Sequence, residues 1–176
     1  MNVFISLLYL FIFMQTAPAP RPIASGSVNF KIKNAGFWAD GNFAGLQGSI
    51  AFDPQQPGAG KITATVDATT IDTGMGMRDK HLRSDDYFDV AQHPEIRMES
   101  TSIKKRGPNR YTGTFNLTIR GVTKQVEVPF TVRQQNGQQV FSGEFTINRR
   151  NFEVGGGSLL LSDQATVSIK AVVEER

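Results

Sequence analysis

The sequence predicts an all-β fold in which about eight antiparallel strands form either a sandwich or a closed barrel. Three observations predict it. Apolar and polar residues alternate with a period of two through most of the chain after Ser25, as they do in strands that bury one face. Turn-forming residues separate the alternating runs, and no long stretch has the 3.6-residue period of a helix.

The alternating runs are the expected strands, taken in order along the chain. In each run one set of side chains is mainly apolar, and the other is rich in Thr, Lys, Gln and Glu. The outer face of the sheet is therefore expected to lie in water. The strands are expected at residues 28–32, 42–52, 62–68, 95–104, 111–119, 126–132, 141–147 and 165–173, and those at 42–52 and 95–104 are less regular than the others.

The connections between these runs support antiparallel pairing. Asn136-Gly137 is a strong signal for a tight hairpin, because both central residues of that turn need a positive φ. Gly107-Pro108-Asn109 is a second short connection, and short turns join antiparallel neighbours. The connection at residues 72–95 is long, and one short helix is expected in it at about residues 76–84.

The expected inner face mixes large and small residues. Phenylalanines alternate with alanines and glycines such as Ala64 and Ala165. Eight-stranded barrels are either filled by their own side chains or hold one small ligand, and the composition leaves both open. Core packing is expected for Trp38, with a barrel end or a tunnel wall as alternatives.

The composition excludes several classes of function. The 176 residues include no cysteine and two histidines, so disulfides, thiolate metal sites and a cysteine nucleophile are excluded. We expect no metal site and no cofactor. The net charge of +3 is too small to indicate nucleic-acid binding. Function is therefore expected from carboxylates, hydroxyls, basic groups or the shape of an apolar cavity.

The first 19 residues are predicted to be a secretory signal peptide. Val3–Met14 is a nearly unbroken apolar run that is too short to span a bilayer comfortably. Ala17 and Ala19 then supply the small residues of an A-x-A cleavage site. The alternative is an uncleaved membrane anchor. Residues 20–24 are expected to be a linker, residues 25–176 the folded domain, and the mature protein periplasmic or secreted.

Several motifs carry a resemblance to a known family. I-D-T-G at residues 71–74 is followed by R-D-K-H-L-R-S-D-D-Y-F-D at 78–89, L-T-I-R-G-V-T-K at 117–124 and F-T-I-N-R-R-N-F at 145–152. In this order and spacing the chain resembles the YceI-like family over residues 25–174. The resemblance implies an eight-stranded, lipocalin-like antiparallel barrel. Members of that family bind polyisoprenoid lipids, such as prenyl quinones or prenyl phosphates, in a long apolar tunnel, and many are periplasmic.

This resemblance implies a non-enzymatic binding protein with a polyisoprenoid ligand. The polar segment 78–89 is expected either to cover one barrel mouth and contact the ligand head group or to brace a long loop. Candidates for head-group contact are Arg78, His81, Arg120 and Arg149. The expected tunnel lining is Phe30, Ile32, Phe43, Leu46, Val66, Met98, Phe115, Leu117, Phe130, Phe145 and Ile169.

Two other classes of function remain open at this point. A fully packed barrel could act as a structural or interaction protein of the envelope, and it would have a filled interior. An enzyme could be built on His81 with Ser84 or a water as nucleophile and Asp79 or Asp86 behind the imidazole, although no nucleophile-elbow motif supports this. We expect no nucleic-acid partner. Transient membrane contact, a homodimer and the identity of the lipid are left open by the sequence.

Overall fold

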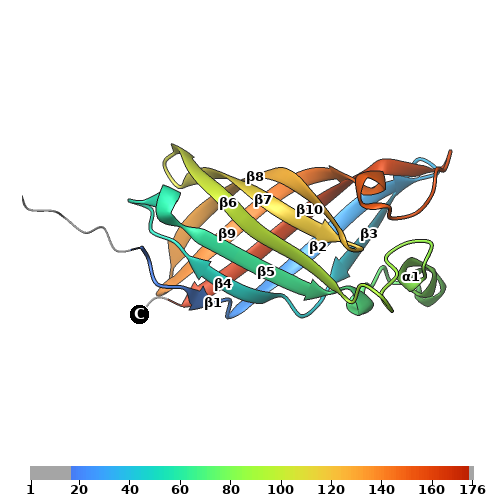
Figure 1. Cartoon of the computed structure of the whole chain (residues 1–176), viewed down its shortest axis with the longest axis horizontal. Helices are drawn as coiled ribbons and strands as arrows, with labels where there is room; N and C mark the ends of the chain where they lie inside the picture. Colours follow the sequence, from blue (N-terminus) through green and yellow to red (C-terminus); the bar gives the residue numbers. More distant parts are fainter. Residues whose placement is uncertain (1–16, 175–176) are drawn as a thin grey trace, which may run out of the picture.

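The computed structural model describes residues 17–174, which form one antiparallel sheet that curls into a barrel-like shape (Figure 1). The strands follow the order β1-β4-β5-β6-β7-β8-β9-β10-β2-β3 across the sheet. They are β1 (Arg21–Pro22), β2 (Ser25–Asn34), β3 (Phe37–Phe43), β4 (Gln47–Ala51), β5 (Lys61–Asp67), β6 (Glu95–Gly107), β7 (Arg110–Ile119), β8 (Val122–Gln135), β9 (Gln138–Asn148) and β10 (Leu161–Glu174).

Tight turns join most consecutive strands, as the sequence predicts. Asn136 and Gly137 have φ angles of 52° and 72°, and they link β8 to β9. Arg120 and Gly121, at 50° and 73°, link β7 to β8 in the same way. Turns with two positive φ angles twist in the sense of the strands that they join, so these pairs fix the register of their hairpins.

Two contacts draw the edges of the curled sheet together. β3 and β4 are consecutive in the chain but lie at opposite sides of the strand order. At one end β1 pairs with β4, and the N–H of Ala24 donates to the carbonyl of Val172 on β10 at 2.8 Å. Towards the other end Asn42 and Asp72 exchange backbone hydrogen bonds of 2.9 and 3.0 Å.

The helix α1 (Gly76–Arg83) lies at one end of the sheet, on the right of Figure 1. It ends at Ser84, whose N–H and hydroxyl both donate to the carbonyl of His81. The segment between η3 and β10 lies at the same end of the molecule. Three short 3-10 helices complete the described chain: η1 (Pro57–Ala59), η2 (Ala68–Thr70) and η3 (Arg149–Phe152).

The fold confirms the all-β, antiparallel prediction and the single short helix near residues 76–84. The strand count differs: ten strands replace eight, because the expected strand at 42–52 divides into the end of β3 and β4, and because β1 is an additional strand. Residues 20–24 are not a free linker, since β1 lies within them and pairs with β4.

The predicted signal peptide and the single tryptophan are the last two features to compare with the structure. The predicted signal peptide at residues 1–19 lies, up to residue 16, outside the described residues. Within residues 17–174, no helix is long and apolar enough to cross a membrane. Trp38 does not pack in the core: 57% of it is exposed, because it pairs with Lys33 across the β2–β3 hairpin and lies with Lys31 and Lys33 on the outer face of the sheet.

Candidate functional site

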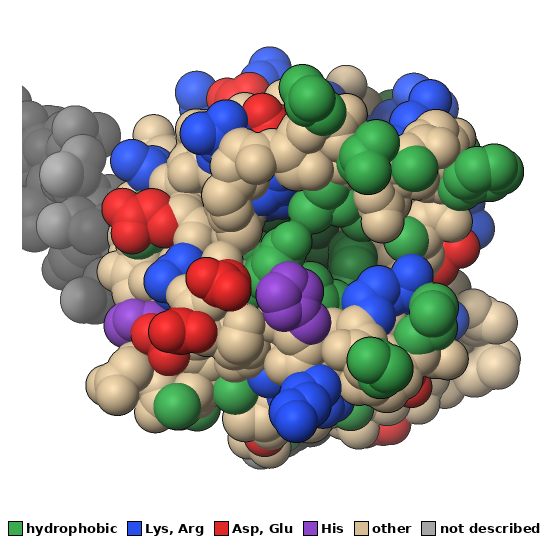
Figure 2. Space-filling view, turned by 90° about the vertical axis from the view of Figure 1, so that its right-hand side faces the viewer, with side chains coloured by type: hydrophobic (Ala, Val, Ile, Leu, Met, Phe, Trp, Pro, Cys, Tyr) green, Lys and Arg blue, Asp and Glu red, His purple; other side chains and the backbone are tan. Residues whose placement is uncertain are grey.

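An apolar cavity of about 280 Å³ lies in the half of the curled sheet next to α1. Figure 2 looks into the mouth of the cavity. It shows hydrophobic side chains deep in the hollow and basic and histidine side chains nearer the surface. The volume is close to the lower end of the range for small-molecule pockets. The apolar wall is formed by Val28, Phe30, Ile32, Phe43, Leu46, Ala64, Val66, Leu82, Tyr87, Phe88, Ile96, Met98, Leu117, Ile119, Phe145, Ile147, Val154, Leu161, Ala165, Val167 and Ile169.

Strand alternation explains most of this wall. Side chains two apart on one strand point to the same face, so alternate residues of β2, β5, β7 and β10 face inward together. Nine of the expected tunnel residues lie on the cavity wall: Phe30, Ile32, Phe43, Leu46, Val66, Met98, Leu117, Phe145 and Ile169. The packed-barrel alternative required a filled interior. The cavity shows that the interior is not filled throughout.

Phe115 and Phe130, which were expected in the lining, do not lie on the cavity wall. Both face inward, but they lie deeper than Leu117 and belong to the packed core. The ring of Phe115 covers Gly113, where a Cβ would come within 2.3 Å of it. Alternation sets the face of the sheet on which a side chain lies, but not its depth along the barrel.

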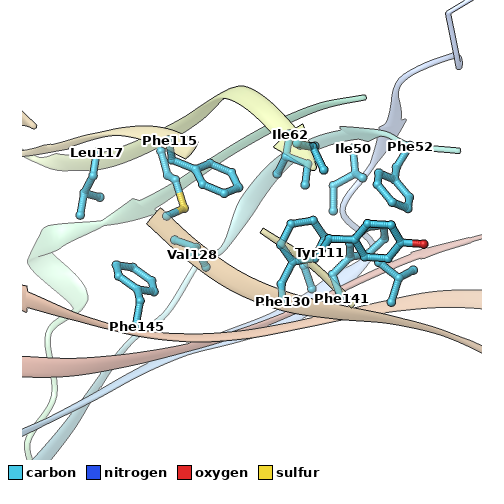
Figure 3. Close-up of a cluster of buried hydrophobic side chains, with 14 of the residues drawn as sticks. Ile50, Phe52, Ile62, Tyr111, Phe115, Leu117, Val128, Phe130, Phe141 and Phe145 are labelled. Atoms are coloured by element: carbon cyan, nitrogen blue, oxygen red, sulfur yellow. The ribbon is translucent and has the colours of Figure 1, made fainter. Parts of the chain in front are cut away.

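An aromatic cluster fills the end of the interior away from α1 (Figure 3). It consists of Phe52, Tyr111, Phe130 and Phe141. The ring of Phe52 packs edge-on against Tyr111 and Phe141, with centroids 5.0 and 5.4 Å apart, and Tyr111 stacks on Phe130 at 5.5 Å. Burial raises the pKa of Tyr111 above its ordinary value of 10, and the negative charge of Asp53 adds to the rise.

The connection that contains α1 adds side chains to the cavity wall. Phe88 packs edge-on against Phe43, with centroids 5.5 Å apart, and Leu82 and Tyr87 line the same space. Sequence reasoning missed these three residues, because an irregular connection has no period that tells inward from outward positions. It also missed Ile147 and Val167, although both continue alternating runs that it had identified.

A partly buried hydrogen-bond network around Asp79 holds this connection in place. Asp79 is 6% exposed, and its carboxylate accepts bonds from the N–H and the hydroxyl of Thr73. Arg78 donates from Nε to the Thr73 hydroxyl at 2.7 Å and from Nη2 to the Thr73 carbonyl at 2.6 Å. Arg78 also lines the cavity, and its Nη1 makes no hydrogen bond within residues 17–174. This residue both braces the connection and presents a donor to the cavity.

His81 lies on the exposed side of α1 and contributes to the cavity wall. Its ring packs against Tyr87 with centroids 4.9 Å apart. The Ser84 hydroxyl donates to the backbone carbonyl of His81 rather than to its imidazole, at 2.7 Å. The hydroxyl therefore caps the helix, and the nucleophile–base pair of the enzyme alternative is not assembled here.

Arg149 lines the cavity but is largely occupied by the loop that leads to β10. It is 5% exposed, and it donates to the carbonyls of Ser162, Val154 and Gly156 and, at 3.0 Å, to the carboxylate of Asp163. These contacts use four of the five guanidinium N–H groups. Arg149 thus mainly braces the mouth.

Arg120 does not reach the cavity. Its guanidinium donates to the backbone carbonyls of Glu153 and Asp85, which ties the α1 connection to the loop after η3. The second histidine is also removed from the cavity, since the ring of His93 lies against Gly121. Within the part of the chain that the structure describes, no group of three His, Asp or Glu residues has the arrangement of a metal site.

A curled antiparallel sheet around an apolar cavity, with polar side chains gathered at the mouth, defines a barrel-like protein with an apolar internal cavity. The chain belongs to the YceI-like family: the family model of the YceI-like domain matches residues 22–173.

Two relatives illustrate the sequence similarity. A UPF0312 protein of Pectobacterium atrosepticum is 37% identical over 134 residues, covering 72% of this chain and 69% of that protein. Protein YceI of Salmonella arizonae is 35% identical over 149 residues, covering 84% and 75%.

Solved structures share the architecture. Burkholderia cenocepacia BcnA superimposes with a TM-score of 0.81 at 29% identity, covering 84% of this chain and 96% of that one. A polyisoprenoid-binding domain from Saccharophagus degradans, implicated in plant cell wall breakdown, gives a TM-score of 0.69 at 15% identity, covering 90% and 99%. This second match shows a common fold.

Proposed function

We propose that the protein is an exported, non-enzymatic binding protein that holds a polyisoprenoid lipid for storage, transport or an envelope stress response. The observation that carries the proposal is the cavity: its wall is mainly apolar, and its polar lining includes Thr73, Arg78 and His81 in or beside α1 and Arg149 in η3. The lipid tail would lie along the inner face of β2, β7 and β10. The head group would stay at the mouth, beside Arg78 and His81.

The apolar wall supports a prenyl tail as the buried part of the ligand. Burying apolar surface stabilises a complex by roughly 25 cal/mol per Å², less the freedom that the chain loses. A wall of branched aliphatic and aromatic side chains offers no groups to satisfy a buried polar tail. The Saccharophagus degradans domain of the same fold is described as polyisoprenoid-binding, which agrees with this ligand class.

The hydrogen bonds at the mouth support a prenyl quinone over a prenyl phosphate. A phosphate is best held by several charge-assisted donors at once. Arg149 has one N–H outside its bonds to the β10 loop, and Arg78 has its Nη1 group. A quinone carbonyl accepts only one or two hydrogen bonds, which Arg78 and His81 could supply.

Export rests on the sequence of residues 1–19. The apolar run and the A-x-A pattern support cleavage and a periplasmic or secreted location. N-terminal sequencing of the secreted protein tests this part separately. A retained Met1 would contradict cleavage and leave the ligand proposal unaffected.

Mass spectrometry of organic extracts tests the ligand. Protein purified from its native host should release an isoprenoid lipid, and delipidated protein should take up added prenyl quinone more strongly than prenyl phosphate. Ala165→Phe places a ring inside the cavity and should abolish both results. Thr166→Phe, on the outer face of the same strand, is the matched control and should retain the lipid. No lipid in wild-type extracts together with no uptake would overturn the proposal.

A further inference from the structure

Large hydrophobic side chains are exposed at one end of the molecule, around the cavity mouth. Among residues 17–174, those with high exposure are Phe37, Trp38, Met75, Met77, Leu159 and Leu160, which we call the rim. Met77 is 90% exposed and Phe37 is 79% exposed. Figure 2 shows hydrophobic side chains standing above and to the right of the hollow. Exposed apolar residues gathered at one site indicate an interaction surface, whereas single scattered ones do not.

The rim is built from three segments that adjoin the cavity wall. Phe37 and Trp38 begin β3, Met75 and Met77 flank the start of α1, and Leu159 and Leu160 precede β10. Each segment adjoins a residue that lines the cavity. Asn34 pairs with Phe37 across the hairpin, Arg78 follows Met77, and Leu161 follows Leu160.

Two of these segments are joined directly. The N–H of Ala35, in the β2–β3 turn, donates to the carbonyl of Leu160 at 2.9 Å. The β2–β3 hairpin and the segment that contains Leu159 and Leu160, which we call the leucine loop, therefore form one continuous apolar edge beside the mouth.

Basic side chains accompany this edge. The ammonium groups of Lys31 and Lys33 lie 5.7 and 5.1 Å from the centre of the Trp38 ring. Arg150 lies beside the leucine loop, with its guanidinium about 3.6 Å from the position that a Cβ on Gly157 would occupy. Acidic side chains gather instead on the left of the hollow in Figure 2. One side of the mouth thus combines apolar tips, a tryptophan and cations.

We propose that the rim docks onto the surface of a lipid bilayer that contains anionic headgroups, so that the cavity mouth faces the membrane. This proposal rests on the proposed lipid ligand, which must leave and enter a membrane through that mouth. Apolar tips can enter the acyl boundary, tryptophan prefers the headgroup level, and lysines extend towards anionic phosphates. A folded protein partner seated on all three segments would instead cover the mouth.

Trp38 makes the docking directly measurable, because it is the only tryptophan in the chain. Vesicles of phosphatidylethanolamine and phosphatidylglycerol should shift its fluorescence to shorter wavelength, and brominated lipids should quench it. Vesicles of phosphatidylcholine alone should bind more weakly. Added salt should weaken the anionic case, because the lysines are exposed.

Two sets of variants separate the apolar and the charged contributions. Leu159→Ser with Leu160→Ser should weaken vesicle binding roughly tenfold or more, which corresponds to about 1.4 kcal/mol. Lys31→Gln with Lys33→Gln should weaken it about fivefold for each lysine. Lys104→Gln with Lys105→Gln, an exposed pair on β6 at the opposite end, is the matched control and should bind as the wild type does.

The outcomes distinguish docking from ligand binding. Rim variants that are loaded with prenyl quinone from detergent should hold as much lipid as the wild type, since none of the substituted leucines and lysines lines the cavity. Unchanged Trp38 fluorescence on vesicle addition would overturn the docking proposal, even if the protein carries lipid. A shift that depends on protein concentration without vesicles would assign the rim to a second copy of the chain, and would also overturn it.

Discussion

Replacing Phe115 by alanine should deepen the cavity and admit a longer lipid tail. Phe115 lies between the cavity-lining Leu117 and the aromatic cluster, with 3% of it exposed, so its ring belongs to the packed core just beyond the cavity wall. Removing the ring opens space over Gly113, which lies two residues before Phe115 on β7, on the side away from Leu117. At about 3.3 Å per residue, the cavity would lengthen by at most about 7 Å.

The same substitution carries a stability cost that can be estimated from burial. A buried Phe→Ala change typically costs about 3–5 kcal/mol, because transfer free energy is lost and a cavity remains. For a chain of this size each kcal/mol lowers Tm by about 2–4 °C, so a decrease of roughly 6–20 °C is expected. Phe115→Leu removes the aromatic ring but keeps an apolar side chain, and it provides a milder variant if the alanine protein does not fold.

The assay compares tail lengths of bound lipid at matched stability. Mass spectrometry after loading with a mixture of prenyl quinones should show longer tails in Phe115→Ala than in the wild type. Phe141→Ala removes an equally buried ring from the aromatic cluster, so it should lower Tm similarly without changing tail length. An unchanged tail distribution in a folded Phe115→Ala protein would refute the view that the Phe115 ring limits the depth of the cavity.

Two further predictions concern stability. Burial, followed by the charge of Asp53, raises the pKa of Tyr111 in the folded state, so the unfolded chain loses this proton first. Stability from this group should therefore be complete below about pH 10 and should decrease as the pH rises above it. Urea unfolding between about pH 9 and 11 should show a smaller decrease in Tyr111→Phe, and an equal decrease would contradict this. Arg149→Lys cannot reproduce four hydrogen bonds and should cost at least about 2 kcal/mol, with faster amide hydrogen exchange in residues 153–163. Arg150→Lys, whose ion pair with Asp163 is exposed and 3.9 Å long, should cost less than about 1 kcal/mol; similar costs for the two variants would contradict the bracing role of Arg149.

Local chemistry made most of the fold predictable. The Asn136-Gly137 turn needs two positive φ angles, and few residue pairs adopt them readily, so the sequence identifies the turn and its hairpin. Alternation likewise assigned Phe30 and Ile169 to the inner face, where they line the cavity. β1 escaped prediction because a two-residue strand is too short to show a period.

The remaining differences follow from tertiary geometry that no local pattern contains. Phe130 and Leu117 both face inward, and only the register and the curl of the sheet separate the packed end from the open one. Trp38 was expected in the core, but the register of the β2–β3 hairpin pairs it with Lys33 on the outer face of the sheet. Arg78 and Arg149 line the cavity and Arg120 does not. Their hydrogen bonds to backbone carbonyls depend on the loop conformation, which the sequence motifs do not specify.

The two halves of the interior have different roles: the packed half stabilises the fold, and the open half is the proposed ligand site. Ile50 and Phe52, at the packed end, are almost fully buried, whereas Ile169 and Val167 on the cavity wall are only half-buried. Wall residues lack partners on one side, so their dispersion contacts are incomplete until a ligand fills the space. A lipid that binds only the folded state supplies those contacts and adds RT ln(1 + [L]/Kd), about 2.7 kcal/mol when the free ligand is at 100 times Kd. The open half is therefore expected to gain most from the ligand, while the aromatic cluster keeps the empty protein folded.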